Sequence, residues 1–275
     1  MTYNPANDGA QMDFNGRMSY GEYLHIDEIL AQQHPLSTAH DEMLFIIQHQ
    51  TSELWMKLLL HELGSARGAI AQDNLPVAFK MMARASRILE QLNNAWDVLR
   101  TMTPSDYTKF RDTLGQSSGF QSLQYRMIEF ALGNRNAAMI KPHAHLADAS
   151  AILETEMQTP SLYTEVLRYA TRQGFNLPDA ALDVQTTPHE AIPEITAMWQ
   201  KIYADTGNHW TLYELAEKLV DIEDYFRRWR FNHLTTVQRI IGFKRGTGGT
   251  SGVHYLQRML GVELFPELWN VRTEL

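Results

Sequence analysis

The sequence predicts an all-α fold, and three observations support this prediction. Apolar residues recur at helical spacing along most of the 275 residues, serine, threonine and proline stand where helices would begin, and no segment shows the convincing alternation of a β-strand. With 44% hydrophobic and 20% charged residues, the composition is that of an ordinary folded protein. A chain of this length buries roughly 70–75% of its unfolded surface. We therefore expect a single helical domain over residues 1–275.

The first half of the chain contains two predicted long helices, at about 41–69 and 75–100. Thr38 stands where it could cap the first of them. Thr103 and Pro104 predict the start of a short helix that ends near Leu114, because proline at the first helical position gives up an N–H that has no partner there. The residues expected to face the core are Met43, Leu44, Ile47, Leu54, Leu58 and Leu59 on the first helix, and Phe79, Met82, Leu89, Leu92, Trp96 and Leu99 on the second.

The second half contains the longest predicted helix, which runs to about Ile241. Thr211 and Glu214 have the spacing of a capping box at its start. The charged residues at 227–230 are interpreted as a solvated face around one buried tryptophan. Before this helix, the pattern at about 145–206 is less regular, and we predict an inserted helical region there. The apolar stripe of the long helix consists of Leu212, Leu215, Leu219, Ile222, Phe226, Trp229, His233, Val237 and Ile240.

A glycine-rich segment follows this helix. Residues 242–252 include five glycines, which are entropically costly to order, so we expect the segment to fold closely over a neighbouring group. It is not a dinucleotide-binding loop, because Ser251 stands where the third glycine belongs and a helix precedes it. The spacing of a P-loop is also missing. An ordinary ordered connection is the alternative interpretation.

Composition excludes several classes of function. The net charge of −8 argues against a nucleic-acid binder. The absence of cysteine excludes disulfides, iron–sulfur clusters and thiolate-bound metals, so a metal or haem would need histidine, carboxylate, tyrosine or methionine. No run approaches the about 20 apolar residues of a membrane span, and the first eight residues do not look like a signal peptide. We expect a cytoplasmic protein that binds no membrane.

Three local patterns could carry chemistry. Phe45 and His49 lie one helical turn apart, and Tyr107 and Arg111 repeat that spacing. His233 is the histidine of the apolar stripe. Together these residues could supply a metal ligand, a second imidazole, an aromatic wall and a clamp for a carboxylate. Each also has an ordinary interpretation: the histidines as hydrogen-bonded core residues, Phe45 as core, and Arg111 as a solvated charge.

Long stretches of the chain resemble the tryptophan 2,3-dioxygenases, a family of haem enzymes that open the indole ring of L-tryptophan. These stretches are residues 41–55 (DEMLFIIQHQTSELW), 110–112, 117–126 (SSGFQSLQYR), 229–252 and 265–268. The resemblance extends from about Tyr20 to Thr273 and is weakest in the inserted region. Multi-residue matches in the same order are far more specific than any single spacing.

The resemblance implies a role for each motif residue. His233 would be the axial ligand of the haem iron, and His49 would contact the indole N–H, either as a base or only to position the substrate. Arg111 would pair with the substrate carboxylate. The residues implied in substrate binding are Phe45, His49, Tyr107, Arg111, Thr247, Tyr20, Tyr23 and Leu24, and those implied at the haem are His233, Ser118 and Gly248.

The resemblance also implies a cofactor, a reaction and an assembly. One haem b per subunit would serve to insert both atoms of O2 across the indole C2–C3 bond, which yields N-formyl-L-kynurenine, the first step of tryptophan degradation by the kynurenine pathway. A homotetramer is expected, with residues 1–40 contacting a neighbouring subunit and Tyr20, Tyr23 and Leu24 reaching into its pocket.

Two other functions are compatible with the same patterns. One is a haem enzyme of this architecture that acts on another indole or aromatic amine, which a comparison of tryptophan with tryptamine and indole-3-propionate would distinguish. The other is a helical haem carrier or oligomeric scaffold without activity, for which Arg111 would not matter.

Overall fold

The computed structural model describes residues 3–275, and this part of the chain contains helices and no β-strand, so the all-α prediction is confirmed. None of the described helices is both long and apolar enough to cross a membrane. Short 3-10 helices lie at Pro5–Asp8, Arg111–Leu114, Gly119–Gln121, Ala137–Met139 and Lys141–His143. The α-helices are α1 (Tyr20–Leu24), α2 (Ile26–Leu30), α3 (His40–Ala71), α4 (Leu75–Leu99), α5 (Pro104–Thr108), α6 (Leu123–Ala131), α7 (Ala147–Met157), α8 (Leu162–Arg172), α9 (Asp179–Leu182), α10 (Pro193–Ala204), α11 (Trp210–Ile241), α12 (Val253–Leu260) and α13 (Pro266–Glu274).

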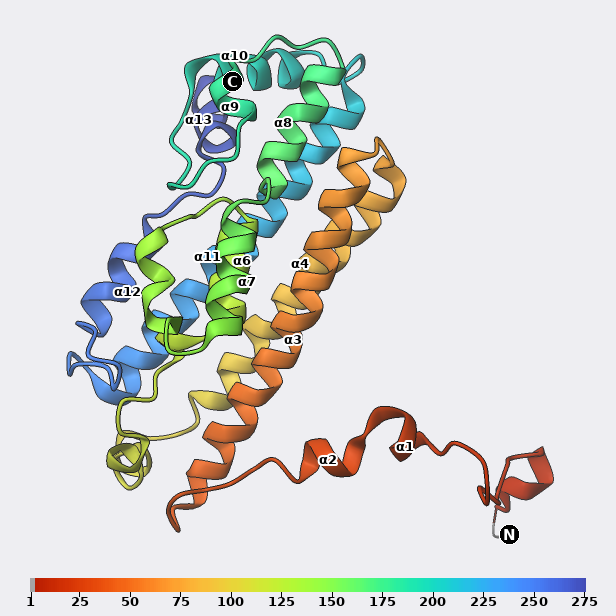
Figure 1. The fold of residues 1–275 in the computed structure, drawn as a ribbon, viewed down its shortest axis with the longest axis vertical. Helices are drawn as coiled ribbons and strands as arrows, with labels where there is room; N and C mark the ends of the chain where they lie inside the picture. Colours follow the sequence, from red (N-terminus) through yellow and green to blue (C-terminus); the bar gives the residue numbers. More distant parts are fainter. Residues whose placement is uncertain (1–2) are drawn as a thin grey trace.

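Three long helices form the centre of the molecule. α3 and α4 make an antiparallel hairpin, and α11 packs along α4 (Figure 1). Alanines at the contact, such as Ala66, Ala78 and Ala216, are fully buried and let the helices approach closely. The predicted stripe of α11 is confirmed from Leu212 to Phe226, where all its members are buried.

Shorter helices close the two ends of this centre. α8 packs on α3 and α11, and α13 packs on α10, at the end of the bundle drawn uppermost in Figure 1. Residues 145–206 form α7 to α10, so the region predicted as inserted is helical. At the other end, α5 packs between α3 and α11. The N-terminal arm with α1 and α2 extends away from the bundle beyond the start of α3 (Figure 1).

The predicted core face of α3 is wrong for four of its residues. Met43, Ile47, Leu54 and Leu58 are 37% to 55% exposed, whereas Leu59 is fully buried as predicted. Both faces of α3 carry apolar residues, so periodicity alone could not identify the face that α4 covers. That face instead consists of Met56, Leu59, Leu63, Ala66 and Ile70.

Two predicted helix caps are also wrong. Thr38 does not cap α3; the buried Glu42 carboxylate in the first turn instead accepts hydrogen bonds from the backbone N–H groups of Leu36 (2.7 Å) and Ser37 (2.8 Å). α11 begins at Trp210 with no side-chain cap, so Thr211 lies inside the helix. In neither place does the predicted threonine cap the helix.

The residues at 227–230 do not form a wholly solvated face. Arg230 is 3% exposed and donates to the Glu129 carboxylate of α6 at 3.1 Å. The prediction failed because the partner carboxylate is about a hundred residues away in the sequence.

We expect Leu215→Ala to destabilise the protein by about 2–5 kcal/mol, because it leaves a cavity in the fully buried stripe of α11. Urea denaturation at one fixed protein concentration measures this change. Leu146→Ala, at a 53% exposed leucine, is the control and should change the free energy of unfolding by no more than about 0.5 kcal/mol. Equal losses in the two variants would contradict the assignment of the core.

Candidate functional site

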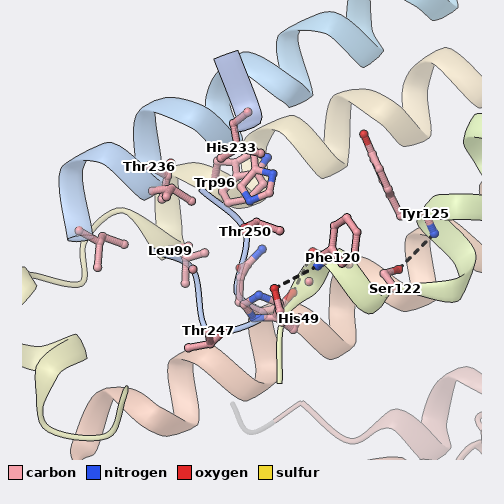
Figure 2. Close-up of a pocket in the computed structure, with 18 of the residues that line it drawn as sticks. His49, Trp96, Leu99, Phe120, Ser122, Tyr125, His233, Thr236, Thr247 and Thr250 are labelled. Atoms are coloured by element: carbon pink, nitrogen blue, oxygen red, sulfur yellow. Dashed lines mark hydrogen bonds between the residues drawn. The ribbon is translucent and has the colours of Figure 1, made fainter. Parts of the chain in front are cut away.

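A cavity of about 240 Å³ lies between α3, α4, α11, the 117–126 segment and the glycine-rich segment. This volume is many times what one water molecule requires, so the cavity is large enough to hold a ligand. His233 reaches it from α11 and His49 from α3, on opposite sides (Figure 2). Six of the residues predicted from the sequence line it: Phe45, His49, Tyr107, Ser118, Thr247 and His233.

His233 lies where α11 passes the cavity. Its imidazole stacks on the Trp96 indole, with ring centroids 5.0 Å apart and planes at 17°. Burial, with a smaller contribution from His49, lowers the pKa of His233 to about 4. The ring is therefore neutral at physiological pH, and a neutral imidazole is the form that binds a metal.

His49 lies one turn after Phe45 on α3. Its Nδ1 atom is 2.7 Å from the Phe45 carbonyl oxygen, which can only accept, so Nδ1 carries the proton and Nε2 is left as an acceptor. Burial lowers the pKa of His49, and the Phe45 carbonyl and the Glu53 carboxylate partly offset this effect. The site therefore presents a neutral, oriented imidazole that can accept a hydrogen bond.

Phe45 and Tyr107 form an aromatic wall next to His49. The Phe45 ring lies 4.1 Å from the His49 ring and 6.1 Å from the Tyr107 ring. Burial raises the pKa of the Tyr107 phenol, and the nearby Arg111 guanidinium partly offsets this. Arg111 is not among the residues that line the cavity; its guanidinium adjoins the Tyr107 phenol, which does line it, and its Nη2 donates to the Arg245 carbonyl oxygen at 2.7 Å.

The glycine-rich segment closes one side of the cavity. The Thr247 hydroxyl donates to the Ser117 carbonyl oxygen, and this contact joins the segment to the 117–126 loop. A Cβ atom at Gly248 would lie 2.7 Å from the Ser118 Cβ atom, so no larger residue fits there without a shift. Gly248 therefore acts at the site by permitting this close approach.

Tyr20, Tyr23 and Leu24 do not line the cavity of their own chain. They belong to α1 on the N-terminal arm, where Tyr20 is 77% and Tyr23 is 70% exposed. Their predicted contact with a neighbouring subunit stays a prediction.

A buried ion cluster in the cavity wall was not predicted from the sequence. Arg126 and Arg230 both line the cavity and both pair with the buried Glu129 carboxylate. Arg126 and Glu129 are three residues apart on α6, a spacing that predicts an ion pair, so this part of the cluster could have been predicted from the sequence. Within this cluster two guanidinium groups face one carboxylate, so the cluster has excess positive charge that an acidic group of a ligand would compensate. A further carboxylate of the cavity wall, Glu53, lies outside the cluster and accepts hydrogen bonds from Ser122 and Gln124.

Comparison with known proteins identifies close relatives. The profile of the tryptophan 2,3-dioxygenase family matches residues 5–177 and 185–275, and the gap falls inside the region predicted as inserted. A tryptophan 2,3-dioxygenase of Bradyrhizobium diazoefficiens is 67% identical over 98% of each chain. Enzymes of the same name from Ruegeria pomeroyi and Bordetella pertussis are 60% and 59% identical, over 99% and 97% of this chain and 99% and 94% of theirs.

We expect the ligand-free chain to lose stability as the pH falls from about 6.5 to about 4. In that window an unfolded His233 binds a proton, whereas the folded one, with its pKa at about 4, does not. His233→Leu removes this titrating group, so the free energy of unfolding should depend less steeply on pH. The slope should fall by at most about 1.4 kcal/mol per pH unit, the value for uptake of one proton on unfolding. Urea denaturation of both proteins at a series of pH values measures the two slopes. Identical slopes would show that His233 is not buried as a neutral ring.

Proposed function

This chain belongs to the tryptophan 2,3-dioxygenase family, and we propose that the cavity between α3 and α11 is where it converts L-tryptophan and O2 into N-formyl-L-kynurenine with the help of haem. The similarity to named relatives over nearly the whole chain supports oxidation of tryptophan by O2, the first step of its degradation by the kynurenine pathway. One observation supports the site above all others: two neutral imidazoles, His233 and His49, flank a single cavity.

The donor set of the cavity fits haem b, at one per chain. A porphyrin supplies four nitrogen ligands to its iron, so the protein needs to supply only one imidazole as a further ligand. His233 is available for this role because it has no hydrogen-bond partner within residues 3–275. The excess positive charge of Arg126 and Arg230 over Glu129 suits the propionate groups. When bound, the haem supplies the redox chemistry that activates O2.

His49 orients the indole. Its Nε2 atom is a free acceptor and can bind the indole N–H, while the Phe45 ring packs against the aromatic face. Because the pKa of His49 is lowered, the ring stays neutral and its acceptor stays available at physiological pH. Both oxygen atoms enter the product and the C2–C3 bond breaks, so no external electron donor is consumed.

The amino-acid end of the substrate is held at the rim of the cavity. Arg111 uses one of its five N–H donors on the Arg245 carbonyl, which leaves the others for a carboxylate. Thr247 and Tyr107 supply hydroxyl groups beside it, for the ammonium and carboxylate groups. Since the glycine-rich segment already closes over the site, binding the zwitterion there also excludes water from the indole.

We propose a homotetramer in which the N-terminal arm completes the pocket of a neighbouring subunit. The arm carries exposed apolar side chains, among them Tyr20, Tyr23 and Leu30, that its own chain does not cover. Met43, Ile47, Leu54 and Leu58 form a second exposed apolar face on α3. A cytoplasmic location stays a prediction.

Haem-loaded, reduced protein supplied with L-tryptophan and air should form N-formyl-L-kynurenine. Arg111→Leu should lower kcat/KM by the equivalent of roughly 2–5 kcal/mol, because the substrate carboxylate loses its charged partner. Absorbance of the product measures this. Arg245→Leu is the matched control, since Arg245 contributes only its carbonyl oxygen. Equal activity in Arg111→Leu, or equal turnover of tryptamine and tryptophan, would contradict the clamp.

Light scattering should give four times the chain mass for the intact protein. Replacement of both Ile47 and Leu54 by lysine should reduce the mass, because charged side chains would have to be buried between subunits. Lysine at Leu146, which is equally exposed outside this face, should leave the mass unchanged. A monomeric wild-type protein would exclude the tetramer.

A further inference from the structure

Trp96 has no part in the function proposed so far, yet it makes the closest ring contact of His233. We propose that Trp96 is a positioning residue whose indole fixes the plane of the imidazole that holds the haem iron. This inference rests on the proposed function, because it concerns the same ligand. The stacked pair lies at the wall of the cavity, with Trp96 on α4 and His233 on α11 (Figure 2).

Two indoles restrict the imidazole. Trp96 stacks nearly parallel to it, at 5.0 Å and 17°, and Trp229 lies one turn earlier on α11 at 5.3 Å and 56°. The two indoles also contact each other, with centroids 5.5 Å apart. Rotation of the imidazole about its Cβ–Cγ bond would drive its edge into one of these rings.

Polar contacts on both sides of the stack fix how α4 and α11 align. One turn before Trp96, the Asn93 amide donates to the Tyr225 carbonyl oxygen at 3.0 Å and accepts from the Asn232 amide at 3.0 Å. One turn after Trp96, the Arg100 guanidinium donates to the Thr236 hydroxyl at 3.3 Å. These contacts fix the position of α4 along α11, so Trp96 faces His233 and not a residue one helical turn earlier or later.

Neither ring of the pair is oriented by a hydrogen bond. The Trp96 Nε1 atom is buried and has no acceptor in the described part of the chain, although a buried indole N–H usually finds one. His233 likewise has no carboxylate or carbonyl partner there, whereas a ligating histidine usually donates its second N–H to such a group. The stack therefore takes the orienting role that a hydrogen bond has in other metal sites.

Trp96→Leu and Trp96→Phe test this proposal in the haem-loaded protein. Leucine removes the stacking surface, so the ferrous iron–histidine stretching band in resonance Raman spectra should shift or broaden. Transfer of haem to apomyoglobin should accelerate by roughly 10- to 100-fold, the range known for loss of a group that orients a metal ligand. Phenylalanine keeps an aromatic face but removes the N–H, and should behave like the wild type in both measurements.

Trp199→Leu is the matched control, because Trp199 is fully buried in α10, away from the cavity. It should lower thermal stability and leave the Raman band unchanged. Should Trp96→Leu fail to fold, Trp96→Met fills the same space with a flexible, non-planar side chain. A wild-type protein without a histidine-ligated haem band would refute the proposed function itself. A normal band and normal haem transfer in the leucine or methionine variant would overturn only the inference about Trp96.

Discussion

The site depends on a neutral imidazole held at a cavity between the long helices of the bundle. His233 occupies a position of the α11 stripe where its neighbours are apolar, and burial lowers its pKa to about 4. The ring is tolerated there because it faces a cavity and stacks on Trp96. Packing of α11 on α4, to which Asn93 and Arg100 contribute polar contacts, therefore places this imidazole at the cavity.

Around this imidazole, segments far apart in the sequence each supply one surface. α3 contributes His49 and Phe45, and α5 contributes Tyr107. The glycine-rich segment reaches the 117–126 loop only because Gly248 has no Cβ atom to collide with Ser118. Helices thus carry the two imidazoles, and a glycine-rich loop covers them. This division suits an enzyme whose protein part positions the substrate while the cofactor does the chemistry.

Local sequence signals predicted most of the helices, but they did not predict all of the caps or which face of a helix is buried. Proline and capping residues at Thr103 and Pro104 predicted the start of α5, and that cap is present. The same logic failed at Thr211, where no side-chain cap forms. It also failed for the face of α3, because a helix with apolar residues on both faces does not reveal in isolation which of them is covered by the bundle and which stays exposed.

The sequence by itself determined that the chain is helical and that His233 lies in an apolar stripe, because both are properties of local spacing. It also determined which motif residues resemble those of a known enzyme family, because this follows from multi-residue matches. Only the tertiary structure decided that six of those residues line one cavity, that Arg230 is buried against Glu129, and that Trp96 stacks on His233. The physical reason is that burial, ion pairing and stacking need partners from distant helices, and local periodicity contains no information about how those helices align.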